Sequence, residues 1–79
     1  MKHIEEILNE ILPGKKNLDS QNLIEDGVID SFDLMCILDA IEKEYRIEID
    51  IDDMEEKNFK NVASMEKLIT KYMRAKREG

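Results

Sequence analysis

The sequence predicts an all-α domain: a small four-helix bundle of three main helices and one short helix, with a long loop between the first and second helices. Its 79 residues suffice for one hydrophobic core, so residues 1–79 are treated as a single domain. Hydrophobic residues make up 42% of the chain but aromatic residues only 5%, so the core must consist mainly of Ile, Leu, Met and Val. Three glycines and one proline are too few for a many-turned β-sandwich or barrel.

The first predicted helix covers the N-terminal dozen residues and stops at Pro13-Gly14. Its apolar residues recur every three or four positions, as on one face of an amphipathic helix. They are Ile4, Ile7, Leu8, Ile11 and Leu12. Residues 13–30 follow as a long polar connection, a length that is uncommon in small domains and often functional. The apolar residues scattered through it predict a loop pinned across the core: Leu18, Leu23, Ile24, Val28 and Ile29.

The second predicted helix begins at Asp30-Ser31 and runs to about residue 45. Its apolar stripe has intervals of four, three and four, and Met35 and Ile37 widen it. The stripe is Leu34, Leu38, Ile41 and Tyr45.

Residues 46–53 alternate apolar and charged side chains, which taken alone is a strand pattern. No second alternating run exists to pair with it, so we expect an extended connector that buries Ile47, Ile49 and Ile51. Residues 52–60 are expected to form a short helical turn with Met54 and Phe59 facing inward.

The last predicted helix begins after Ser64, which is expected to be its N-cap. Its apolar stripe is Met65, Leu68, Ile69, Tyr72 and Met73. Basic residues gather at its C-terminal end, where they suit the helix dipole: Lys71, Arg74, Lys76 and Arg77.

Negative charge is concentrated in the middle of the chain. The whole sequence has a net charge of −7, but residues 19–56 contain fourteen acids and two bases, a net charge of −12. Such a surface repels nucleic-acid phosphates and anionic lipid and attracts basic protein surfaces. We therefore expect a protein partner, no nucleic acid and no stable membrane insertion.

Several classes of protein are disfavoured by composition. One cysteine, Cys36, excludes an intramolecular disulfide, and with one histidine, His3, it cannot form a Cys/His zinc site. The first residues do not resemble a signal peptide, and the longest apolar run is far too short to span a membrane. A cytoplasmic protein is expected. Asp50, Asp52 and the acids after them do not match a calcium loop, because Met54 and Glu55 occupy positions where an oxygen ligand and glycine are needed.

The segment Asp26 to Asp33 is the most informative part of the sequence. Asp30-Ser31 places a hydroxyl at a helix N-terminus, where free backbone N–H groups and the helix dipole would favour a phosphoester on the serine. Ser31 has no histidine nearby in sequence to act as a base, and its neighbours Asp30 and Asp33 disfavour an alkoxide. Ser31 is therefore a candidate modification site rather than a catalytic nucleophile.

Here the chain resembles the acyl carrier protein family, including its peptidyl and D-alanyl carrier branches. The family's attachment motif is Asp-Ser followed by a hydrophobic residue at the start of the second helix, and the matching run is Gly27-Val28-Ile29-Asp30-Ser31-Phe32. Asn58-Phe59-Lys60-Asn61-Val62 is similar to the segment entering the last helix in that family. The resemblance covers essentially the whole chain.

The resemblance implies a freestanding, non-catalytic carrier. A phosphopantetheinyl transferase would attach 4'-phosphopantetheine from coenzyme A to Ser31, and the thiol of that arm would hold an acyl or aminoacyl group as a thioester. A loading ligase and downstream transferases would be further partners, and the protein would be a monomer. Recognition by these partners is expected to use acidic and exposed apolar residues around Ser31 and along the second helix: Asp30, Phe32, Asp33, Met35, Asp39 and Glu42.

Two departures from the family pattern narrow this expectation. Carriers of fatty acid synthesis typically have acids where this chain has Cys36 and Lys43, so the acidic ridge of the second helix is interrupted. A dedicated carrier for an amino acid, a small acyl group or a specialised pathway is favoured.

Alternative readings of these features remain. Ser31 could simply be a capping serine, or a first-turn serine behind an Asp30 cap completed by Asp33. Cys36 is expected to be a small, partly buried core residue rather than a reactive thiol. The competing function is an unmodified acidic helical adaptor that binds basic protein partners. A small hydrolase or isomerase lacks a nucleophile paired with an acid or base.

Overall fold

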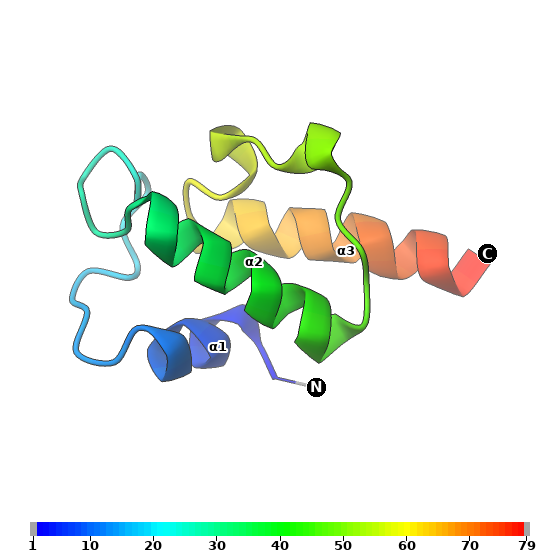
Figure 1. Cartoon of the computed structure of the whole chain (residues 1–79), viewed down its shortest axis with the longest axis horizontal. Helices are drawn as coiled ribbons and strands as arrows, with labels where there is room; N and C mark the ends of the chain where they lie inside the picture. The colour runs from blue at the N-terminus through cyan, green and yellow to red at the C-terminus, as the bar shows by residue number, and fades with distance from the viewer. Residues whose placement is uncertain (1, 79) are drawn as a thin grey trace.

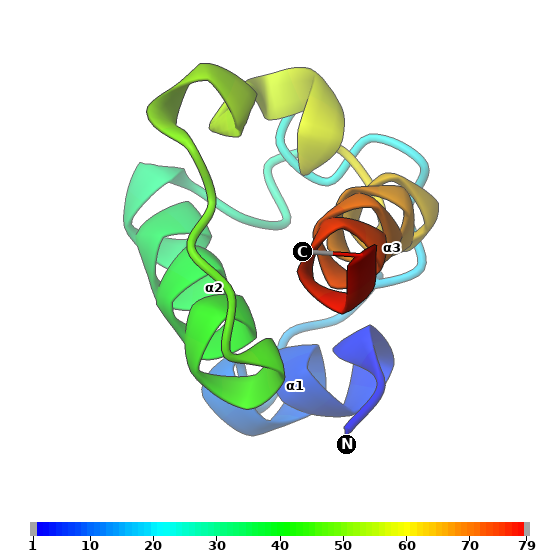
Figure 2. The same ribbon diagram turned by 90° about the vertical axis from the view of Figure 1, so that its right-hand side faces the viewer.

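The computed structural model describes residues 2–78, which form three α-helices and no strand. The helices are α1 (Ile4–Ile11), α2 (Ser31–Tyr45) and α3 (Val62–Glu78), and two single-turn 3₁₀ helices, η1 (Ile51–Asp53) and η2 (Glu56–Asn58), lie between α2 and α3. Viewed along α3, the three helices surround a common interior, and the 3₁₀ turns lie at the side opposite α1 (Figures 1 and 2). The all-helical class is confirmed. The four-helix bundle is not confirmed, because residues 52–60, expected to be the fourth helix, contain only these 3₁₀ turns.

The core is aliphatic, as the low aromatic content predicts. Each helix contributes one face, and Phe59 is its one buried aromatic residue within the described part of the chain. Ile37, Ile41 and Met65 are fully buried at the centre. The remaining buried apolar side chains are Ile4, Ile7, Leu8, Leu12, Leu23, Ile29, Ile47, Ile49, Leu68 and Ile69.

The loop between α1 and α2 is pinned across the core, as predicted. The side chain of Leu23 is completely buried, and its backbone N–H donates a hydrogen bond to the carbonyl oxygen of Lys60 at 2.6 Å. Val28 and Ile29 both donate backbone hydrogen bonds to the carbonyl oxygen of Leu23. These bonds close the loop just before α2 begins, so they fix the direction from which the chain enters that helix.

The chain after α2 corrects two expectations. Ile47 and Ile49 are buried, but Ile51 is 81% exposed and lies in η1. Met54, expected to face inward, is 41% exposed, whereas Phe59 is buried as predicted. Strict alternation ends once the chain turns into η1, because a 3₁₀ turn does not keep the twofold side-chain period of an extended chain.

The start of α3 corrects the expected position of its N-cap. The helix begins at Val62, and Asn61 caps it: its side-chain oxygen accepts a hydrogen bond from the Ser64 N–H at 2.8 Å. Asn61 also donates from Nδ2 to the carbonyl oxygen of Gln21 at 3.0 Å, which ties the loop to the helix start. Ser64, expected to be the N-cap, lies inside the first turn. Asn and Ser are about equally good caps, so the sequence alone did not separate them.

The burial of α2 differs along its predicted stripe: Ile37 and Ile41 are buried, Leu34, Leu38 and Tyr45 are partly buried, and Met35, expected to widen the stripe, is 67% exposed. Ile41 sets the first prediction. Ile41→Ala removes a fully buried side chain and is expected to lower the free energy of unfolding by about 2–5 kcal/mol. Ile51→Ala makes the same change at a position that is 81% exposed and should change the free energy of unfolding little. Urea denaturation of both variants checks this. Equal losses in the two variants would contradict the packing described for α2.

Candidate functional site

The start of α2 is closed by a reciprocal capping box. The Asp30 side chain accepts a hydrogen bond from the Asp33 N–H at 2.9 Å, and the Asp33 side chain accepts one from the Asp30 N–H at 3.2 Å. These bonds satisfy the backbone N–H of Asp30, just before the helix, and that of Asp33, in the first turn of the helix. Asp30 is therefore the N-cap, and Ser31 is the first residue of the helix.

Ser31 projects from this start into solvent. Its residue is exposed, and among the side-chain hydrogen bonds of residues 2–78 none involves Ser31. Since Asp30 supplies the cap, the Ser31 hydroxyl is not needed for capping. The side chain is available to an enzyme acting from outside.

The side chains at the start of α2 are acidic, although the helix dipole gives this end a partial positive charge. The backbone N–H of Asp33, followed by the charge of Lys15, holds the pKa of the Asp30 carboxyl below its ordinary value, so this group is ionised at neutral pH. Asp33, also acidic, forms an ion pair with Lys15, whose Nζ lies 3.4 Å from Asp33 Oδ2. Ser31 thus lies between two carboxylates that are partly compensated by one lysine.

Lys15 is the residue at this site that sequence reasoning missed. It follows Pro13-Gly14, and Gly14 has φ 82°, the left-handed value expected of glycine in a type II turn after proline. The Lys15 N–H donates to the carbonyl oxygen of Leu12 at 3.2 Å, which closes this turn. The Pro-Gly pair signals the turn, but only the path of the loop brings residue 15 next to residue 33.

The other residues expected to recognise partners have different environments. Phe32 and Met35 are 75% and 67% exposed on α2. Asp39 is exposed and forms an ion pair with Lys43 at 3.0 Å. Glu42 is partly buried, and its Oε2 accepts a hydrogen bond from the Ile49 N–H at 2.9 Å. Glu42 therefore holds the connector after α2, a role that the sequence did not indicate.

Other candidate residues lie elsewhere. Cys36 is half-buried, as expected for a small core residue, and His3 is exposed before α1. Within residues 2–78 there is no group of three or more His, Cys, Asp or Glu side chains arranged to hold a metal ion. None of the helices in that range combines the length and apolar character needed to cross a bilayer.

Comparisons with protein-family models, with curated proteins and with solved structures return no significant match for this chain.

The capping box predicts a pH-dependent contribution to stability. The pKa of the Asp30 carboxyl is lower in the folded protein than its ordinary value of 3.8, so its ionised form stabilises the fold above pH 3.8. This contribution disappears as the pH falls through the lower folded-state pKa. Asp30→Asn keeps a capping oxygen but removes the charge, so it should melt below the wild type at neutral pH and converge with it in acid. Thermal melts from neutral pH down to about pH 2 measure this. Asp52→Asn, with the same change in net charge, is the control. If the melting temperature of Asp30→Asn differed from that of the wild type by the same amount at every pH, the ionised Asp30 carboxylate would not be what stabilises the cap.

The Glu42 contact predicts a structural effect. Glu42→Ala leaves the buried connector without its acceptor for the Ile49 N–H and should destabilise the protein by about 1 kcal/mol. Hydrogen exchange at the Ile49 amide should become faster, whereas Asp39→Ala should leave it unchanged. Unaltered exchange in Glu42→Ala would show that the contact does not protect the connector.

Proposed function

We propose that the protein is a freestanding carrier whose Ser31 holds a 4'-phosphopantetheine arm. The observation that carries this proposal is the exposed, unengaged hydroxyl of Ser31 on the first residue of α2, directly after the capping Asp30. The resemblance of Gly27 to Phe32 to the attachment motif of acyl carrier proteins adds the identity of the group. An acyl or aminoacyl cargo, in a specialised pathway, is the expected load.

The attachment step is a phosphoryl transfer. The Ser31 oxygen attacks the phosphorus of coenzyme A that carries pantetheine, a serine O–P bond forms, and the pyrophosphate P–O bond breaks to release 3',5'-adenosine diphosphate. The proton of the hydroxyl passes to a base of the phosphopantetheinyl transferase. The carrier supplies no base, because its one histidine, His3, precedes α1, and Asp30 and Asp33 are engaged in the cap.

The role of the carrier after attachment is delivery. A thioester on a tethered arm is presented to each docked enzyme at a high effective concentration, so the carrier needs a recognisable surface rather than catalytic groups. Phe32 and Met35 are exposed apolar side chains close to Ser31 in sequence, and acidic residues surround them. Transferase, loading ligase and downstream transferases with basic docking surfaces fit this arrangement. We propose a monomer acting in the cytoplasm.

A second candidate function rests on exposed apolar side chains. Among residues 2–78 four large ones are exposed, Phe32, Met35, Ile51 and Met54, and all lie within the segment 19–56, whose net charge is −12. An unmodified adaptor that binds basic, partly apolar protein surfaces would use these residues without Ser31. Modification of Ser31 separates the two functions.

The test is incubation of the purified protein with coenzyme A and a promiscuous phosphopantetheinyl transferase, followed by intact-mass measurement. The carrier function predicts a mass gain of one phosphopantetheine group in the wild type and none in Ser31→Ala. Ser20→Ala, which changes a serine of the loop between α1 and α2, should be modified normally. Absence of any gain in well-folded wild-type protein would favour the adaptor.

Ser31→Ala should leave the melting temperature nearly unchanged, because Asp30 and Asp33 form the cap without it. Circular dichroism checks this on the same sample used for mass measurement. Unfolding of Ser31→Ala would show that the serine is structural.

A further inference from the structure

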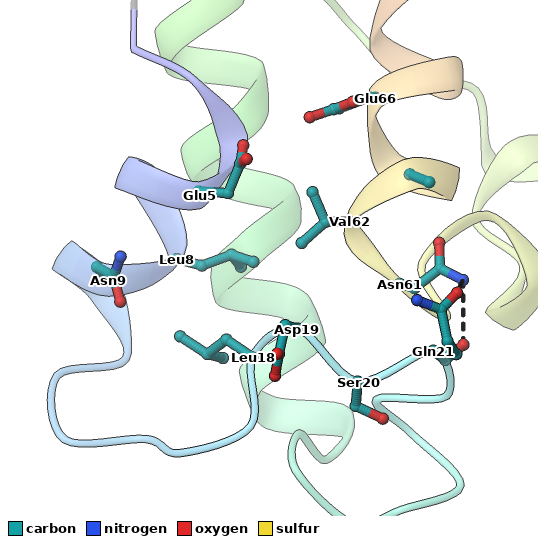
Figure 3. A pocket seen from close by; sticks show the side chains of 11 residues that line it. Glu5, Leu8, Asn9, Leu18, Asp19, Ser20, Gln21, Asn61, Val62 and Glu66 are labelled. Atoms are coloured by element: carbon teal, nitrogen blue, oxygen red, sulfur yellow. Dashed lines mark hydrogen bonds between the residues drawn. The ribbon is translucent and has the colours of Figure 1, made fainter.

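A cavity of about 420 Å³ opens where α1, the loop and the start of α3 meet (Figure 3). Ser31 is not one of its lining residues, so the cavity is separate from the proposed attachment site. Its volume lies within the range of small-molecule sites, about 300–1,000 Å³.

The interior of the cavity is apolar. In Figure 3, Leu8 from α1 and Val62 from α3 lie between these two helices, and Leu18 from the loop lies below Leu8. Leu8 is almost completely buried, whereas Leu18 and Val62 are only half-buried and keep apolar surface facing this space. An aliphatic chain placed here would remove that surface from water.

The rim of the cavity is acidic. Glu5, Asp19 and Glu66 line it, and no Lys, Arg or His side chain does. In the described part of the chain none of these three acids forms an ion pair, although five other acids do: Glu10, Asp33, Asp39, Asp53 and Glu55.

Glu5 and Glu66 act on the same region of the molecule. Burial raises the pKa of the Tyr45 hydroxyl, and the charges of Glu44, Glu66 and Glu5 raise it further. Tyr45 does not line the cavity; at the cavity itself the acids of the rim face no cationic side chain of the lining.

A polar contact joins two segments of the cavity lining, the loop and the start of α3. Asn61 donates to the carbonyl oxygen of Gln21 (Figure 3). It also accepts from the Ser64 N–H, so the loop is tied to the capped start of α3. A ligand would enter a largely formed site, which reduces the entropy cost of binding.

We infer that this cavity binds a small amphiphilic amine, with its aliphatic chain against Leu8, Leu18 and Val62 and its ammonium group between Glu5 and Glu66. This function goes beyond the carrier function and does not depend on it. Apolar burial supplies affinity, and the unpaired carboxylates select a cation over a neutral or anionic compound of equal length.

The experiment compares three chain-matched probes, octylammonium, octanol and octanoate, by NMR titration of the folded protein. Octylammonium should bind about tenfold more tightly than octanol, and octanoate should bind least, with shifts at the amides of Leu18, Val62 and Glu66. Raising the salt concentration should reduce the preference for octylammonium.

Two sets of variants test the parts of the site. Glu5→Gln with Glu66→Gln should abolish the preference for octylammonium over octanol, whereas Glu48→Gln with Glu56→Gln, an equal change of charge at exposed residues outside the cavity lining, should retain it. Ala63→Trp, at an exposed lining position, should weaken both octylammonium and octanol.

Three results with these probes would overturn the inference, and a fourth comes from a peptide probe. They are equal binding of all three probes, shifts confined to Phe32, Met35 and Ile51, and a preference for octylammonium that survives in Glu5→Gln with Glu66→Gln. Binding of a short Leu-Lys peptide at the cavity without binding of octylammonium would also overturn it, in favour of a lysine side chain of a partner protein.

Discussion

The paired hydrogen bonds between Asp30 and Asp33 determine where α2 begins, and the rest of the site depends on that point. Because Asp30 is the cap, Ser31 becomes the first helical residue and its hydroxyl is left free in solvent. The loop supports the same geometry from the other side, since the buried Leu23 and its bond to Lys60 fix the approach of the chain. A capping serine at position 31 would have used the hydroxyl that the carrier function needs.

Periodicity predicted the parts of the fold in which one side of a helix is buried. The limits of α1 and α2, the pinned loop and the buried Phe59 follow from apolar spacing and from turn residues, which are local signals. Ile51, Met54 and Ser64 were placed wrongly because their environments depend on choices that the local sequence leaves open. Extended chain and 3₁₀ turn compete after Ile49, and Asn61 and Ser64 compete as caps.

The candidate site shows the same division. The Asp-Ser step at the helix start was predictable from the sequence, because it is a local signal. Whether Ser31 or Asp30 is the cap stayed open, and only the structure assigns the cap to Asp30. The roles of Lys15 and Glu42 were not predictable, since the contact of Lys15 with Asp33 spans the loop and that of Glu42 with Ile49 depends on the path of the connector. The acidic cavity could not be predicted either, because its walls come from three segments that only the tertiary packing brings together.

The most direct test of the carrier function is peptide mass spectrometry of the protein purified from its native host under conditions that preserve thioesters. The carrier function predicts phosphopantetheine on the peptide containing Ser31, in part with an acyl or aminoacyl group still on the thiol. A peptide containing Ser31 that is unmodified throughout, in cells that modify other carriers, would contradict it.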